Sequence, residues 1–132
     1  MNIVRRFSLR HALLADALVS GTTGLLLTLG AGFLTSFLGL PDTLLRYVGV
    51  SLLPYAAVIA FIATRRPIPS TAVWAVIVIN ALWALDSIVL LLSGWVSPNI
   101  FGAGFIIVQA AAVALFAEIQ YISLRRGLAR AA

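Results

Sequence analysis

An acid and an amide lie close together inside one long apolar segment of this chain. Asp86 and Asn80 belong to the stretch from residue 71 to residue 94, which is long enough to cross a bilayer as a helix. Such groups are costly in hydrocarbon, so both side chains are expected to face protein or water. At about 100° per residue, Trp83 and Ser87 fall on the same broad flank as Asn80 and Asp86. This flank is the predicted inward face of the segment.

Other polar residues are expected at the depth of Asp86. A rise of about 1.5 Å per residue places Asp86 about 12 Å, Gln109 about 15 Å and Thr28 about 13 Å from the outer ends of their segments. Arg46 is expected slightly above this layer, where its side chain can reach Asp86 and form an ion pair. The candidate intramembrane site therefore consists of Asp86, Asn80, Trp83, Gln109 and Arg46.

Each of these residues also has a structural interpretation. Asn80 and Gln109 are expected to join helices by hydrogen bonds, and Trp83 is expected to pack. Asp86 is either a structural partner of Arg46 or Gln109, or a group that binds protons or substrate.

A second polar layer is expected nearer the cytoplasm, with Asp16 and Glu118 as secondary candidates. His11 and Arg125 are near enough in the sequence to serve as their partners. Because both acids are placed close to the interface, roles as solvated or arginine-paired surface groups are favoured.

The composition explains why these residues are interpreted in a membrane. The chain has 132 residues, of which 62% are hydrophobic and 10% charged, with a mean hydropathy of +1.10. A soluble domain of this size cannot hide so much apolar surface. The predicted fold is all-α: one transmembrane domain, 1–132, forming a four-helix bundle with short loops. The expected spans cover about 11–37, 44–64, 71–94 and 100–124, after a basic interfacial lead at 1–10.

The positive charge is arranged to set an orientation rather than to bind nucleic acid. All nine basic residues are arginine, and eight of them fall in three segments that can share one membrane face; only Arg46 falls on the other side. This is the positive-inside pattern, which predicts that both termini are cytoplasmic in a multi-pass protein of the bacterial inner membrane. The basic face is expected to contact anionic lipid.

Enzyme chemistry and metal binding find little material in this sequence. Cysteine is absent and His11 is the one histidine, so thiol redox chemistry, thiolate metal sites and histidine clusters are excluded within one chain. No phosphate loop, metalloprotease or serine hydrolase motif occurs. We expect no cofactor, no metal and no enzymatic activity.

Small and polar residues follow one face of the first span at steps of three and four. In lipid such a stripe lets two helices approach closely, so it predicts a packing surface. Its members are Ala17, Ser20, Gly21, Gly24, Thr28, Ala31, Gly32 and Thr35.

This layout of four spans and short loops resembles that of the small, uncharacterised four-helix proteins of bacterial inner membranes. Asp16 also resembles, in its position on the first span, the acid of small multidrug resistance transporters. Those transporters typically carry a glutamate placed deeper in the span, and many lack a strong charge bias, so the arginine pattern here departs from them.

Three functions follow as hypotheses. The first is a non-enzymatic accessory or assembly subunit, alone or in a larger membrane complex. The alternative is a small proton-coupled transporter that works as a homodimer, since four helices leave little internal space, with Asp86 as the titrating group. A third is a lipid-modifying or lipid-binding protein that uses the basic inner face.

Overall fold

The computed structural model describes residues 8–131, with side chains described up to residue 126. Five helices follow one another along the chain: α2 (Leu9–Leu29), α3 (Ala31–Leu38), α4 (Asp42–Thr64), α5 (Ser70–Ser93) and α6 (Ile100–Ala131). The prediction of an all-α fold is confirmed. Four of these helices, α2, α4, α5 and α6, are long and apolar enough to cross a membrane.

The first predicted span, about 11–37, is wrong as a single helix. It is divided at Gly30, whose backbone (φ −103°, ψ 10°) leaves the helical conformation between α2 and α3. A Cβ atom at this position would lie 2.8 Å from the Leu26 carbonyl oxygen, so glycine permits this tight turn, and glycine also weakens a helix that continues through it. The start also differs, because the Ser8 hydroxyl accepts the backbone N–H of His11 at 3.2 Å and caps α2 earlier than expected. Most of the predicted basic lead, residues 1–7, lies outside the described residues.

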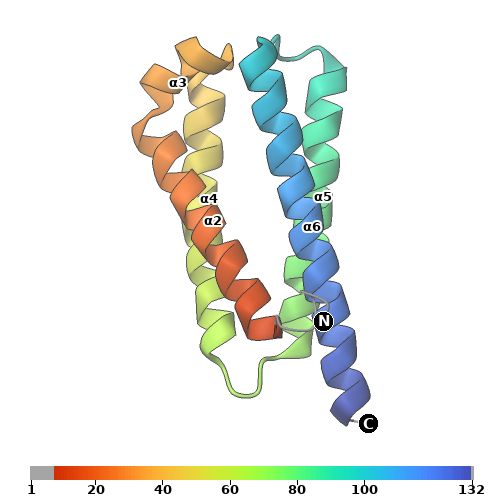
Figure 1. The fold of residues 1–132 in the computed structure, drawn as a ribbon. Helices are drawn as coiled ribbons and strands as arrows, with labels where there is room; N and C mark the ends of the chain where they lie inside the picture. Colours follow the sequence, from red (N-terminus) through yellow and green to blue (C-terminus); the bar gives the residue numbers. More distant parts are fainter. Residues whose placement is uncertain (1–7, 132) are drawn as a thin grey trace.

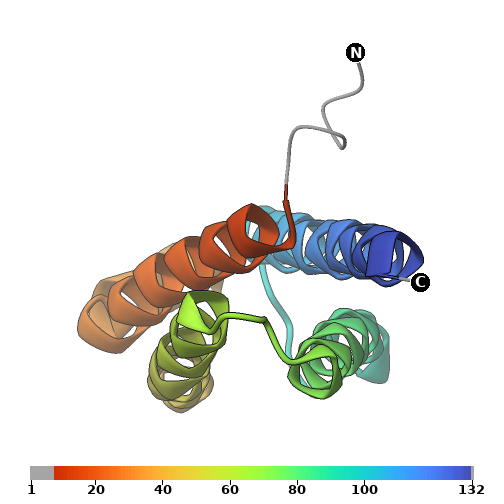
Figure 2. The ribbon, with the colours of Figure 1, turned by 90° about the horizontal axis from the view of Figure 1, so that it is seen from below.

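The long helices associate as two pairs. Figure 1 shows α2 running beside α4, and α5 beside α6, whereas α4 and α5 touch at few points. Seen along the helices in Figure 2, α2 and α6 lie on one side of the molecule and α4 and α5 on the other. The pairs therefore behave as two halves that meet along the middle of the molecule.

The predicted packing stripe of the first span is confirmed where α2 meets α4. A Cβ atom added to Gly24 would lie 3.0 Å from the Gly49 carbonyl oxygen, and one added to Gly49 would lie 2.6 Å from the Thr28 backbone nitrogen. Glycine at both positions lets the two backbones approach this closely. Gly32 is different, because an added Cβ there would meet nothing within 4 Å.

Two apolar clusters hold the halves together. The inner cluster lies near the α4–α5 connection and joins all four long helices. It contains Leu13, Ile59, Ile62, Ala63, Val73, Val76, Ile77, Ala117 and Leu124. The outer cluster lies near the opposite end and contains Leu27, Ala31, Leu38, Leu40, Leu45, Leu52 and Ile106. A layer of the molecule between these clusters is left for polar side chains.

One end of the molecule gathers most of the described arginines. The start of α2, the end of α6 and the connection 65–69 lie together at this end (Figure 1). Arg10 there donates to the backbone oxygens of Ala63, at 2.7 Å, and Arg65, at 3.1 Å. These carbonyls lie at the end of α4, where helical partners run out, so Arg10 satisfies and electrostatically complements that end.

The outer surface of the molecule is strongly apolar. Leu18 is 71% exposed, Leu29 82% and Leu92 81%, and they are surrounded by further exposed aliphatic and aromatic side chains. Soluble monomers rarely present apolar surface on this scale. Lipid is the solvent that suits such a surface.

Candidate functional site

A buried carboxylate, Asp16 of α2, organises the polar layer between the two apolar clusters. Its side chain is 2% exposed, although it lies only about two helical turns from the start of α2. Oδ2 accepts the side-chain amide of Asn80 at 2.8 Å and that of Gln120 at 2.8 Å. Oδ1 accepts the hydroxyl of Ser20 at 3.0 Å. Helices α2, α5 and α6 are thus joined at one carboxyl group.

Tyr55 adds α4 to this group of side chains. Its hydroxyl lies 2.6 Å from Asn80 Oδ1 and 3.5 Å from Asp16 Oδ2, so its single proton is directed to Asn80. The Asn80 amide donates a second time, to Gln120 Oε1 at 3.1 Å, which uses both of its hydrogens. We call Asp16, Ser20, Tyr55, Asn80 and Gln120 the Asp16 cluster.

The Asp16 cluster surrounds a buried carboxyl group with neutral donors. The hydrogen bonds described for Asp16 come from two amides, the Ser20 hydroxyl and, at a longer distance, the Tyr55 hydroxyl, rather than from an arginine. A buried acid is costly unless it is hydrogen-bonded, and a fully connected network inside a low-dielectric interior fixes the positions of its members. The cluster therefore defines the register of all four long helices around Asp16.

A second polar group joins α5 and α6 nearer the connection between these two helices. The Trp83 indole donates to Gln109 Oε1 at 2.9 Å, and the Gln109 amide donates to the Ser87 hydroxyl at 2.7 Å and to the Ile106 carbonyl at 3.0 Å. Ser87 in turn donates to the Trp83 carbonyl at 2.8 Å. The expected role of Gln109 and Asn80 in joining helices agrees with these interhelical bonds.

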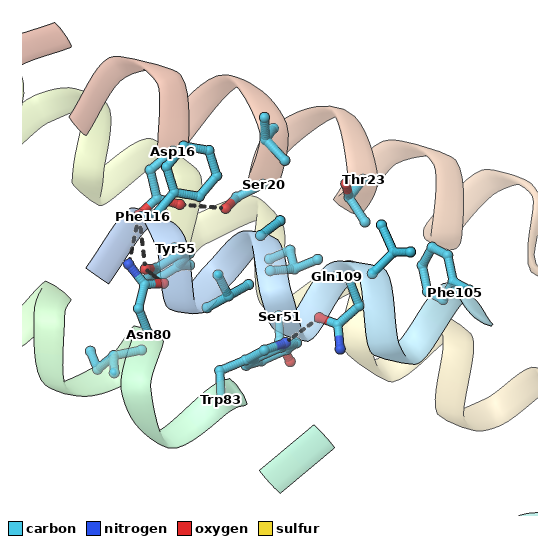
Figure 3. A pocket seen from close by; sticks show the side chains of 16 residues that line it. Asp16, Ser20, Thr23, Ser51, Tyr55, Asn80, Trp83, Phe105, Gln109 and Phe116 are labelled. Carbon is cyan, nitrogen blue, oxygen red and sulfur yellow. Dashed lines mark hydrogen bonds between the residues drawn. The ribbon is translucent and has the colours of Figure 1, made fainter. Parts of the chain in front are cut away.

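A cavity of about 400 Å³ extends from the Asp16 cluster to the Trp83–Gln109 pair. Figure 3 shows Asp16, Ser20 and Asn80 near one end of it and Trp83 and Gln109 farther along. Its lining comes from Asp16, Val19, Ser20 and Thr23 of α2; Ser51, Leu52 and Tyr55 of α4; Ile79, Asn80 and Trp83 of α5; and Phe105, Val108, Gln109, Ala112, Val113 and Phe116 of α6. The walls are mostly aliphatic and aromatic, and a smaller cavity of about 90 Å³ adjoins it beyond Trp83.

The cavity has the features of a small-molecule site. Its volume falls in the range of about 300–1,000 Å³ that ligand pockets occupy, and a few convergent polar groups face mostly apolar walls. The acid at one end favours a cation or a hydrogen-bond donor. The indole of Trp83 offers an aromatic face of the kind that attracts cations.

The prediction that Asp16 is a solvated or arginine-paired surface group is wrong. Asp16 is buried, and its partners are the other members of the Asp16 cluster. The suggested partner His11 has its Nδ1 3.0 Å from the Ser8 hydroxyl. The partners Tyr55, Asn80 and Gln120 lie 39, 64 and 104 residues away along the chain, so depth in the first span alone could not reveal them.

The predicted ion pair between Arg46 and Asp86 is also wrong within one chain. Arg46 pairs with Asp42, one turn earlier on α4, at 3.3 Å, and both side chains are largely exposed. Asp86 is exposed, because Asn80 and Ser87 define the buried face of α5 and Asp86 is turned about 100° away from Ser87. Acids within a span are costly and nearly always face protein or water, so an outward Asp86, about four residues past the middle of α5, is a conspicuous feature.

The remaining expected positions are divided between the surface and helix contacts. Glu118 is exposed on α6, and Arg125 lies over the ring of Tyr121 at 5.9 Å rather than beside that acid. Thr28 lies at the contact of α2 with Gly49 of α4. Residues 8–126 hold no group of three or more histidines and acids placed to bind a metal ion.

Tyr55 and Gln120 are members of the site that the sequence interpretation did not assign to it. One signal was present: Gln109 and Gln120 lie eleven residues, or about three helical turns, apart on α6 and so share a face. Tyr55 follows Pro54 inside α4, and its hydroxyl bonds to Asn80 rather than to a backbone carbonyl freed by the proline.

Comparison with known proteins finds no relative of this chain. No protein-family model, no curated protein and no solved structure matches the chain at a significant level. Proposals about its function therefore rest on the residues described above.

Proposed function

We propose that this chain is a multi-pass protein of a bacterial inner membrane that binds a small, mainly apolar cation in its central cavity and carries it across the bilayer. Both termini are cytoplasmic, in keeping with eight of nine arginines in the segments that share the inner face. Asp16, rather than Asp86, is the acidic group of the site.

One observation carries this proposal: a buried carboxylate, held by neutral donors, stands at the end of an apolar cavity. Asp16 Oδ2 accepts hydrogen bonds from two amides, whereas Oδ1 accepts one from the Ser20 hydroxyl. Both Asp16 and Ser20 line the cavity. A carboxylate oxygen can accept more than one hydrogen bond, so Oδ1 can also serve a ligand. A cation in the cavity would give Asp16 a charged partner, which none of the residues that the structure describes supplies.

The arrangement of the helices supports movement of such a ligand. The cavity lies between the α2–α4 pair and the α5–α6 pair, and apolar clusters close the molecule toward both ends. Rocking of one helix pair against the other around a site near the middle of the membrane is the general way in which small carriers expose a site to either side.

Binding can be tested with one cation and its neutral analogue. Benzyltrimethylammonium and neopentylbenzene have the same shape but differ in charge, and isothermal titration calorimetry on the protein in nanodiscs compares their affinities. We expect the cation to bind at least tenfold more tightly. Asp16→Asn removes the charge but keeps an acceptor for Asn80 and Gln120 and a donor for Ser20, so it should abolish the preference without unfolding the protein.

Two control variants sharpen this test. Asp86→Asn removes an acid outside the cavity and should leave the preference for the cation intact. Ala112→Leu fills part of the cavity and should lower the affinity for both compounds. Equal affinities in the wild type, or an equal loss in Asp16→Asn and Asp86→Asn, contradict the proposal.

A second candidate is the accessory or assembly subunit. It is favoured by the extent of hydrogen bonding in the Asp16 cluster, in which both amides and the tyrosine hydroxyl already have protein partners. Such a cluster is explained by packing alone. In that case Asp16→Asn changes stability and the level of protein in the membrane, while neither compound binds with measurable selectivity.

A further inference from the structure

Asp86, the exposed acid of α5, lies at a depth where contact with lipid hydrocarbon is unfavourable. Asp86 is seven residues before the end of α5 at Ser93, or about 10 Å along the helix axis. Its neighbours on the same face, Leu82 and Val89, are exposed and apolar. Among the residues that the structure describes, none forms a hydrogen bond or ion pair with Asp86. Intramembrane acids nearly always face protein or water, so this face is incomplete in a single copy.

The chain itself carries a complementary charge at a similar depth. Arg46 is four residues after the start of α4 at Asp42, or about 6 Å along the axis, and its side chain is 56% exposed. Its partner Asp42 is 42% exposed and one turn away, an arrangement that contributes little energy and does not hold Arg46 in place. The difference in depth between Arg46 and Asp86 is about 4 Å, less than one helical turn.

A symmetric dimer formed through α4 and α5 can join these residues in pairs. Figure 2 shows α4 and α5 on the same side of the molecule. A two-fold axis parallel to the helices, placed outside this side, sets α4 of each copy opposite α5 of the other. Under such symmetry, one contact between Arg46 and Asp86 necessarily occurs twice.

We propose that the protein forms a parallel homodimer through α4 and α5, in which Asp86 of each copy pairs with Arg46 of the other. Exposed apolar side chains lie near both residues, so the dimer replaces lipid contacts with protein contacts while Asp86 gains a charged partner. All copies insert with the same orientation under the arginine bias, which permits a parallel dimer. The inference does not depend on a ligand in the cavity.

A charge exchange tests the pairing. Copies with two different fluorescent labels are reconstituted in lipid vesicles, and energy transfer at fixed protein-to-lipid ratio measures association. Asp86→Arg alone and Arg46→Asp alone should each lower the dimer fraction at least tenfold, because they place like charges opposite each other. The double variant D86R/R46D should restore it. Asp86→Asn, which folds without a buried charge, should give an intermediate loss.

A cross-linking measurement identifies the contact directly, since the chain has no native cysteine. Copies carrying Arg46→Cys and copies carrying Asp86→Cys are expressed together and treated with a short bis-maleimide. The two kinds of copy carry different affinity tags, and a cross-linked product that contains both tags is expected. Copies carrying Leu18→Cys, an exposed position on α2, serve as the matched control. They should give little cross-linked product with copies carrying Arg46→Cys or with copies carrying Asp86→Cys.

Two results overturn the proposal. The first is an unchanged dimer fraction in Asp86→Asn together with no rescue by the double exchange. The second is that Asp86→Asn leaves self-association unchanged but abolishes co-purification of a different protein from native membranes. This result assigns the α5 face to a contact with that other protein.

Discussion

The side-chain amide of Asn80 donates to Asp16 Oδ2 at 2.8 Å, joining the third long helix to the first across 64 residues of sequence. The same amide nitrogen also reaches Gln120 on the last helix. Because Asp16 and Asn80 are each 2% exposed, this contact lies in the interior, where an unpaired polar group is expensive. The most consequential substitutions in the protein are therefore expected to be those that leave half of this contact behind.

Replacement of Asp16 by alanine should destabilise the protein far more than replacement by asparagine. Alanine removes the acceptor of the buried Gln120 amide and one of the two acceptors of the Asn80 amide, and an unsatisfied buried group costs about 1–3 kcal/mol. We expect Asp16→Ala to lower the free energy of unfolding by about 2–3 kcal/mol, and Asp16→Asn by less than about 1 kcal/mol. Reversible unfolding in mixed micelles measures both. Equal stability of the two variants would show that the bonds contribute little.

Fluorescence of Trp83 should report a ligand in the cavity. Trp83 lines the cavity, whereas Trp74 and Trp95 are exposed on the outer surface. A cation over the indole is attracted by its ring, so binding of benzyltrimethylammonium should change the emission of the wild type. This change should disappear in Trp83→Phe and persist in Trp74→Phe. A signal that survives in Trp83→Phe places the ligand elsewhere.

Substitution of Gly49 should separate α2 from α4. A Cβ atom at this position lies 2.6 Å from the Thr28 nitrogen and 2.9 Å from the Gly24 oxygen, both of them backbone atoms that cannot turn aside. Overpacking of this kind costs about 1–3 kcal/mol, and we expect Gly49→Ala to fall at the upper end. The control is Gly104→Ala, where an added Cβ meets nothing within 4 Å. Thermal denaturation in detergent should separate the two variants clearly.

Loss of the Arg10 side chain should loosen the end of α4. Its two bonds to the carbonyls of Ala63 and Arg65 involve a charged donor, so Arg10→Gln should cost about 1–2 kcal/mol. Amide hydrogen exchange in the last turn of α4 should accelerate. Arg66→Gln removes the same charge from the same face and controls for any change in orientation. If both variants exchange alike, charge rather than the bonds of Arg10 governs this end.

The positions of the long helices could be predicted from the sequence, because length and apolar composition are enough to recognise a helix that can span a membrane. The predicted starts and ends of α4 and α5 lie within two residues of those in the structure. The division at Gly30 was missed, since an apolar run continues through it and a single glycine does not always end a helix.

The inward direction of the two key acids could not be predicted. In a soluble protein the buried face of a helix is its apolar face, but here lipid and protein interior are both apolar, so α5 shows little contrast between its sides. Asn80, Trp83 and Gln109 were placed in the polar interior, as the structure has them. Asp86 and Asp16 are reversed, because only tertiary contacts decide which acid finds donors.

The Asp16 cluster also places a demand on the synthesis of the protein. Asp16 leaves the ribosome 104 residues before Gln120, and Asn80 follows 64 residues after Asp16. Until Asn80 is made, Asp16 lacks both amide donors, and until Gln120 is made it lacks one of them. We therefore expect chains that stop short of α6 to be less stable in the membrane than the full chain.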